Sequence, residues 1–209
     1  MPTASMTLLY SPASPFVRKV LVLLHETGQL DRVALEEVQL SPTSPSATVN
    51  AQNPAGKIPA LRLADGNVLV DSRVILEYLD QQHVGEALIP PSGSARWRRL
   101  SLAALADAIL DAAVLMRYES FLRPADKRWP EWLAAQQAKI EQSLDHFEQH
   151  AIAELSSRFD IAAIGVACAL GYLDLRQPEL GWRQRCPHLA AWFAEVSLRP
   201  SLQASVPPG

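Results

Sequence analysis

The most constraining feature of this 209-residue chain is a change of pattern at about residue 83. Up to that point, short apolar runs bounded by turn residues alternate with helical patterns, whereas the remainder shows only helical periodicity and residues typical of helix ends. We therefore predict two domains, an α/β domain over residues 1–83 and an all-α helical bundle over residues 94–209. The intervening residues 84–93, which include Pro90-Pro91-Ser92-Gly93, should form a linker.

In the first domain, the apolar runs predict the order β-α-β-α-β-β-α, with a right-handed crossover between the first two, parallel strands. This order is thioredoxin-like. Strands are expected at 7–10, 33–38, 58–63 and 67–70, and helices at 15–27 and 72–82, with at most a short, irregular helix over 41–49. Ala64-Asp65-Gly66 favours a tight hairpin turn between the last two strands. The helix over 72–82 should bury Val74, Ile75, Tyr78 and Leu79.

In the second domain, a long helix is expected over 94–120. Leu133, Ile140, Leu144 and Phe147 recur at helical spacing, which predicts one buried face of the next helix. Ser157-Arg158-Phe159-Asp160 fits a capping box for a helix over 161–173, with aspartate where glutamate is usual.

Composition excludes several classes of function. The formal net charge of -3 provides no basic surplus for nucleic acid or anionic lipid, and no apolar run approaches the roughly 18 residues that span a bilayer. We therefore expect a soluble, cytoplasmic protein with neither nucleic acid nor membrane as a partner. Cys168 and Cys186 lack paired spacing and the five histidines lack ligand spacing, so no metal is expected.

Ser14 is the first candidate for chemistry. It precedes Pro15 and suits the N-cap of the helix that begins there, which by itself is a purely structural role. In a functional interpretation, its hydroxyl lies beside the positive end of the helix and donates a hydrogen bond to a ligand thiolate, which lowers the pKa of that thiol. Ser11 and Tyr10 lie nearby and are alternative donors.

Two further pairs suit ligand binding. A cis Ile58-Pro59 bond at the mouth of a strand would let the backbone of Ile58 pair with an extended peptide; a trans proline that closes a loop is the alternative. Asp71-Ser72 stands where a strand meets a helix, so Ser72 can bind an anion and Asp71 an ammonium group, although plain helix capping also explains the pair.

A third polar group lies in the long helix of the second domain. Asp107 and Asp111, followed by Arg117-Tyr118, fit either a polar wall of a second-substrate site or a solvated or subunit-facing stripe, and we leave them out of the predicted site.

Taken in order, several stretches resemble the glutathione S-transferase superfamily over nearly the whole chain, from Leu8 to Pro200. They are Ser14-Pro15-Phe16-Val17-Arg18-Lys19, Asn53-Pro54-Ala55-Gly56-Lys57-Ile58-Pro59-Ala60-Leu61, Asp71-Ser72 with Ile75-Leu76-Glu77-Tyr78-Leu79, Pro187-His188-Leu189 with Trp192, and Arg199-Pro200-Ser201. The spacing of Ser14 and Arg18 is similar to that of bacterial serine-type members near the omega, theta and delta-like branches.

The resemblance implies roles for individual residues. Ser14 would hydrogen-bond the glutathione thiolate, Ile58 beside Pro59 would pair with the cysteinyl backbone, and Lys57 would approach the glycyl carboxylate. Asp71 and Ser72 would bind the γ-glutamyl end. It implies a homodimeric detoxification enzyme with glutathione as co-substrate and no metal, which conjugates small apolar electrophiles or reduces peroxides.

Two other functions stay open. The same fold occurs in non-enzymatic binding and interaction proteins. A specialised glutathione-dependent lyase, dehalogenase or isomerase is the second alternative, although the Ser-Ser-Cys signature of zeta-type isomerases is missing. Serine at the activating position also argues against thiol-transferase chemistry, which uses cysteine there.

Overall fold

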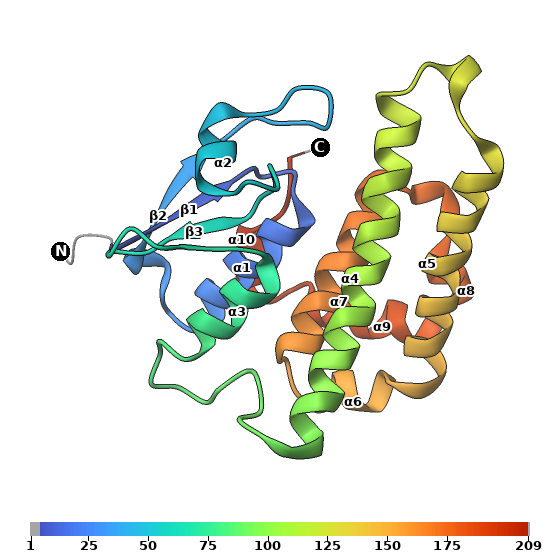
Figure 1. Cartoon of the computed structure of the whole chain (residues 1–209). Coiled ribbons are helices and arrows are strands. Elements are labelled where there is room, and N and C mark those ends of the chain that lie inside the picture. Colours follow the sequence, from blue (N-terminus) through green and yellow to red (C-terminus); the bar gives the residue numbers. More distant parts are fainter. Residues whose placement is uncertain (1–4, 209) are drawn as a thin grey trace. The chain divides into compact units, whose positions relative to one another are not determined.

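The computed structural model describes residues 5–208, which form two compact units (Figure 1). Unit 1 contains the described residues up to Ile89 together with those from Pro200 onward, and unit 2 contains Pro90–Arg199. The extreme ends of the two expected domains, residues 1–4 and 209, lie outside the described residues. Within the described part, no helix is both long and apolar enough to cross a membrane.

Unit 1 is built around a four-stranded mixed sheet in the order β2-β1-β3-β4. β1 pairs with β2 in parallel, while β3 pairs antiparallel with both β1 and β4. The thioredoxin-like class and the predicted order β-α-β-α-β-β-α are confirmed. The elements of unit 1 are β1 (Met6–Tyr10), α1 (Pro15–Glu26), η1 (Leu30–Arg32), β2 (Val33–Glu37), α2 (Ala47–Gln52), β3 (Ala60–Arg62), β4 (Val68–Leu69), α3 (Ser72–Asp80) and α10 (Pro200–Ala204).

Helices cover both faces of this sheet. Leu8 and Leu9 are neighbours in β1 and therefore point to opposite faces, yet both are completely buried. Leu9 packs in a cluster with Val49 of α2, whereas α1 and α3 pack on each other (Figure 1). The predicted hairpin between β3 and β4 is present, and Gly66 at its turn has a φ of 86°, which favours glycine.

Unit 2 is all helical, as predicted. Its central helix, α7, is buried on every side from Ile161 to Leu170, because that stretch is apolar or small throughout. A side chain at Gly165 would meet Ala106 of α4 at 3.2 Å, so the glycine permits close packing of these two helices. The elements of unit 2 are α4 (Gly93–Phe121), η2 (Ala125–Lys127), α5 (Pro130–His150), α6 (Ile152–Ser157), α7 (Ile161–Arg176), η3 (Pro178–Leu180), α8 (Trp182–Arg185) and α9 (Pro187–Val196).

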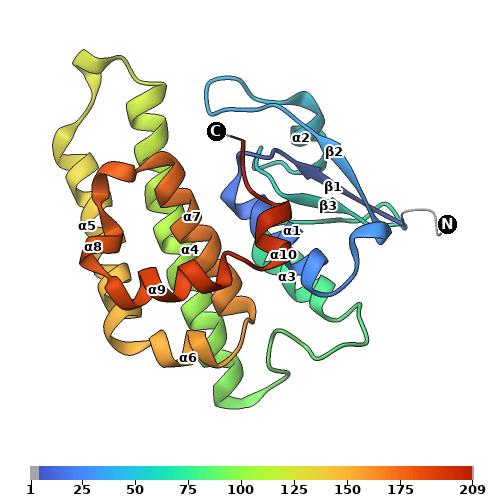
Figure 2. The ribbon, with the colours of Figure 1, turned by 180° about the vertical axis from the view of Figure 1, so that it is seen from behind.

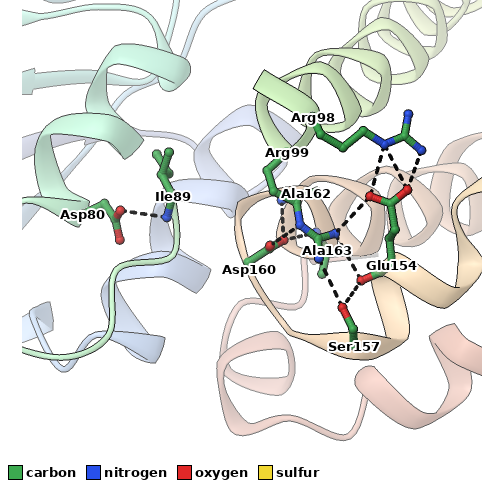
Figure 3. A network of polar contacts seen from close by, with 9 residues as sticks. All are labelled: Asp80, Ile89, Arg98, Arg99, Glu154, Ser157, Asp160, Ala162 and Ala163. Atoms are coloured by element: carbon green, nitrogen blue, oxygen red, sulfur yellow. Dashed lines mark hydrogen bonds and ion pairs between the residues drawn. The ribbon is translucent and has the colours of Figure 1, made fainter. Parts of the chain in front are cut away.

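The start of α7 corrects one prediction. Asp160, not Ser157, is the N-cap residue, and its carboxylate accepts hydrogen bonds from the N–H groups of Ala162 and Ala163 at 3.0 and 3.4 Å. Arg99 of α4 lies 2.9 Å from the other carboxylate oxygen (Figure 3). Burial raises the pKa of Asp160, although Arg99 and the two N–H groups act in the opposite direction. Ser157 instead donates to the carbonyl oxygen of Glu154.

Other details of the predicted elements also differ. α2 is regular and begins at Ala47, because Ser46 accepts a hydrogen bond from Val49 N–H and caps it. In α3, Val74 is 47% exposed rather than buried. The last residues of the chain, which we expected in the helical domain, lie in unit 1, and the boundary between the units falls at Ile89 and Pro90.

Candidate functional site

The topology of the sheet brings three of the predicted segments to one edge. β4 runs parallel to β1, since both are antiparallel to β3, so β1 and β4 end at the edge where β3 begins. Leu9 is opposite Ala60 and Leu61 is opposite Leu69, which makes the three chain segments direct neighbours there. The loop after β1, the residues before β3 and the residues after β4 therefore meet at this edge, which we call the ligand edge.

Ser14 lies in the first of these segments and is the N-cap of α1, as predicted. Its hydroxyl oxygen accepts a hydrogen bond from Val17 N–H at 3.4 Å, and its own N–H donates to the carbonyl oxygen of Ser11 at 3.0 Å. Because the hydroxyl acts there as an acceptor, its proton can turn towards a ligand. Ser11 lies in the same segment, and Tyr10 is the last residue of β1; both are, like Ser14, partly buried.

The second segment holds Lys57, Ile58 and Pro59. The Ile58–Pro59 peptide bond is cis, and Ile58 packs against the cluster around Leu9. Asn53 stabilises this segment through a hydrogen bond. It is 4% exposed, and its side-chain amide donates to the carbonyl oxygen of Lys57 at 2.8 Å. Asn53 has no role in the site predicted from the sequence, because its contact with Lys57 depends on how the loop folds back.

Asp71 and Ser72 form the third segment. Asp71 is the N-cap residue of α3, because its carboxylate accepts a hydrogen bond from Arg73 N–H at 3.0 Å. The capping interpretation of this residue is therefore correct, and its exposed carboxylate is still accessible from solvent. Ser72 is the first helical residue and is 3% exposed. The peptide bond between Val70 and Asp71 is cis.

The ligand edge thus combines the N-termini of two helices, α1 and α3, with the backbone of an extended segment between them. Helix N-termini carry N–H groups and partial positive charge, which favour thiolate and carboxylate groups. An exposed lysine, Lys57, and an exposed carboxylate, Asp71, add one charge of each sign. Such a set suits a short zwitterionic peptide. Among residues 5–208, no cluster of histidine, cysteine and acidic side chains could hold a metal ion.

The polar residues of the long helix α4 differ in how far they are buried. Asp107 is buried at 2% exposure, whereas Asp111 is exposed, so they do not form one solvated stripe. Further along the helix, burial raises the pKa of Tyr118. Burial also raises the pKa of Tyr172 in α7 to about 12, against the effect of Arg176.

Comparisons with known proteins identify the family. Residues 8–87 match the model of the glutathione S-transferase N-terminal domain, and residues 130–195 match that of the C-terminal domain. The uncharacterised GST-like protein YibF of Escherichia coli K12 is 35% identical over 97% of this chain and 99% of its own length. The chain therefore belongs to the glutathione S-transferase superfamily.

Two crystal structures show similar proteins with ligands. A glutathione transferase family member from Pseudomonas fluorescens Pf-5, with bound glutathione, has a TM-score of 0.97 and 65% identity over 98% of this chain and all of its own. A second structure of a family member from the same organism, with bound S-(propanoic acid)-glutathione, has a TM-score of 0.92 and 64% identity, with the same coverage of both chains.

Proposed function

We propose that this protein is a glutathione transferase that binds glutathione at the ligand edge, stabilises its thiolate through Ser14 and adds it to small apolar electrophiles. The observation that carries the proposal is the meeting of Ser14, Ile58-Pro59 and Asp71-Ser72 at one edge of the sheet. The relative from Pseudomonas fluorescens with bound glutathione, at 65% identity, supports the choice of ligand.

Each end of glutathione then has a partner. The carboxylate of the γ-glutamyl residue accepts hydrogen bonds at the N-terminus of α3, where Ser72 lies, and the ammonium group of the same residue pairs with Asp71. The cysteinyl backbone pairs with Ile58, as a short strand would, next to Pro59. Lys57 approaches the glycyl carboxylate. The cysteinyl sulfur then faces the N-terminus of α1, where Ser14 stands.

The transfer reaction needs only deprotonation of the glutathione thiol and a favourable position of the two reactants. A glutathione thiol is almost entirely protonated at neutral pH, and lowering its pKa by about two units, which corresponds to about 2.7 kcal/mol, converts most of it to thiolate. A hydrogen bond from a hydroxyl to a charged group contributes roughly this much. Binding both reactants together then favours attack of the thiolate on the electrophile. Bound S-(propanoic acid)-glutathione in a similar protein supports conjugation, since it is an S-substituted glutathione.

We expect the active form to be a cytoplasmic homodimer that takes part in detoxification, as the family resemblance implies. Light scattering on the purified protein measures the subunit number.

The decisive test separates the hydroxyl of Ser14 from its role as a helix cap. Ser14→Gly removes the hydroxyl but costs the helix only a few tenths of a kcal/mol, whereas Ser14→Ala also loses about 1 kcal/mol of capping. We expect both variants to bind glutathione and to raise the pKa of the bound thiol, measured from the ultraviolet absorbance of the thiolate. If the pKa of the bound thiol rises by about two units, kcat/KM towards an aryl halide should fall about 100-fold when it is measured at a pH below the thiol pKa of both wild type and variant.

Ser11→Ala is the matched control and should leave the thiol pKa unchanged. If Ser11→Ala rather than Ser14→Gly raises it, Ser11 is the donor. Turnover at the wild-type level in Ser14→Gly would contradict the role of Ser14. A thermal shift with glutathione tests binding alone: at 100 times the dissociation constant, the ligand adds about 2.7 kcal/mol to the free energy of unfolding. Binding without turnover of any electrophile would favour a non-enzymatic function.

A further inference from the structure

The last helix of the chain, α10, packs against α1 within unit 1, although the two are separated by most of the sequence (Figure 2). Ser201, Leu202 and Ser205 in this C-terminal segment are at most 8% exposed. Such burial makes residues 200–205, which we call the tail, a structural part of the domain that carries the ligand edge.

The tail is joined to α1 through Arg18. This side chain is 7% exposed, and its guanidinium donates hydrogen bonds to the carbonyl oxygen of Leu202 at 3.1 Å and to the hydroxyl of Ser205 at 3.4 Å. A buried cation needs such acceptors, because without them it loses its hydration with no compensation. The hydroxyl of Ser205 is itself oriented, since it donates to the carbonyl oxygen of Ser201 at 2.8 Å.

Arg18 is also tied to the start of its own helix. Its backbone N–H donates to the carbonyl oxygen of Ser14 at 3.0 Å, which closes the first turn of α1. A second link from the tail reaches the other end of the same helix, where Ser201 donates its hydroxyl proton to Glu26. The tail therefore holds α1 at two points, and the contact through Arg18 lies one turn from Ser14.

We propose that the tail is a brace for α1 and that Arg18 is a positioning residue, which through the brace holds the hydroxyl of Ser14 where the thiolate of glutathione needs it. The catalytic part of this inference rests on the proposed function. Loss of the brace lets the first turns of α1 open more often, because fewer interactions remain to oppose local unfolding. A hydrogen-bond donor displaced by about 1 Å loses much of its effect on a reacting group.

The test uses the full-length chain with single substitutions. Arg18→Met removes the guanidinium but keeps an unbranched apolar chain, and Ser205→Ala removes one of its two acceptors. In both variants, hydrogen exchange measured by mass spectrometry should be faster in a peptide that covers residues 14–20. The pKa of the bound glutathione thiol should rise by about one unit in Arg18→Met. At a pH below the thiol pKa of both wild type and variant, this rise lowers kcat/KM about tenfold.

Ser201→Ala is the matched control. It removes the link to Glu26 and should speed exchange at the C-terminal turn of α1 while the thiol pKa stays at its wild-type value. Arg18→Lys, which keeps the charge but loses the fork of donors, should give an intermediate pKa.

The possible results separate the brace from the proposed function. Exchange over residues 14–20 that is unchanged in Ser205→Ala, or in a folded Arg18→Met, overturns the brace whether or not glutathione binds. Faster exchange with an unchanged thiol pKa overturns the positioning role. A wild-type protein that does not lower the thiol pKa refutes the function of Ser14, and with it the positioning role of Arg18, while the exchange experiment still decides the brace.

Discussion

Glu148 offers the sharpest test of the energetics of unit 2. This residue of α5 caps another helix: its carboxylate accepts hydrogen bonds from the backbone N–H groups of His188 and Leu189, at 2.9 and 2.8 Å, in the first turn of α9. The ring of His188 lies 2.7 Å from the same carboxylate. The side chain of Glu148 is 12% exposed, whereas that of His188 is 75% exposed. The backbone bonds should therefore matter more than the ion pair.

The magnitudes follow from these contacts. Hydrogen bonds to a charged group contribute about 1.5–3 kcal/mol each, but water can reach the N–H of the exposed His188, so Glu148→Ala should cost about 2–3 kcal/mol in total. Glu148→Gln retains one acceptor and should cost about half as much. For a chain of this size, 1 kcal/mol lowers Tm by roughly 2–4 °C, so Glu148→Ala should lower it by roughly 4–12 °C. His188→Ala should cost less than about 1 kcal/mol, as exposed ion pairs do.

The assay is urea unfolding followed by tryptophan fluorescence. The five tryptophans are Trp97, Trp129, Trp132, Trp182 and Trp192, so the signal comes from unit 2 alone. A loss in His188→Ala equal to that in Glu148→Ala would refute the reasoning, because it would mean that the ion pair and not the backbone cap carries the energy.

The contacts of Glu148 also predict how the stability of the protein depends on pH. Burial alone raises the pKa of Glu148, but the N–H groups of His188 and Leu189 and the His188 ring outweigh it and hold the pKa below its usual 4.5. The unfolded chain then binds the proton more tightly, so this contribution to stability is complete above pH 4.5 and is lost as the pH falls through the folded pKa. The stability difference between wild type and Glu148→Gln should therefore shrink in acid. A difference that stays constant down to pH 3 would contradict this assignment.

Three further predictions concern buried groups. Asp160→Ala removes the cap of α7 and should cost at least about 1 kcal/mol in the same urea assay, whereas Asp160→Asn should retain most of the capping energy; equal losses would contradict the capping role. Asp80 accepts hydrogen bonds from the N–H of Leu88 at 2.7 Å and from the N–H of Ile89 at 2.9 Å (Figure 3), so Asp80→Ala should speed hydrogen exchange over residues 83–89, and unchanged exchange would refute that link. Burial raises the pKa of Cys186 to about 11, so an aromatic disulfide reagent at pH 8 should label this thiol only after urea unfolds the protein, and rapid labelling of the folded chain would disprove its burial.

Local chemistry explains why several features could be predicted from the sequence. Ser14 followed by Pro15 begins a helix because a side-chain acceptor and a fixed φ angle act within one turn. Asp65-Gly66 forms the hairpin turn because Gly66 tolerates positive φ. The order of strands and helices likewise follows from apolar runs of a few residues. The predicted ligand-edge residues come together because that order, once folded into a sheet, places their segments at one edge.

Other features depend on partners that are distant in the sequence. The local pattern predicts Ser157 as the cap residue of α7, but Asp160 caps the helix instead, and Arg99 of α4 lies against the carboxylate of Asp160. Val74 is exposed whereas Ile75 and Leu76 of the same helix are buried, because the position of α1 decides which face of α3 is covered.

The sequence by itself therefore determined the two architectures, the order of elements in unit 1 from β1 to α3 and the helix start at Ser14, because each rests on short-range patterns of polarity, glycine and proline. Its resemblance to known members indicated the family. Only the tertiary structure decided that the tail returns to α1 and buries Arg18, and that Glu148 caps a helix forty residues away. Those contacts join segments whose separation along the chain carries no local signal, and burial makes them strong by excluding water from charged groups.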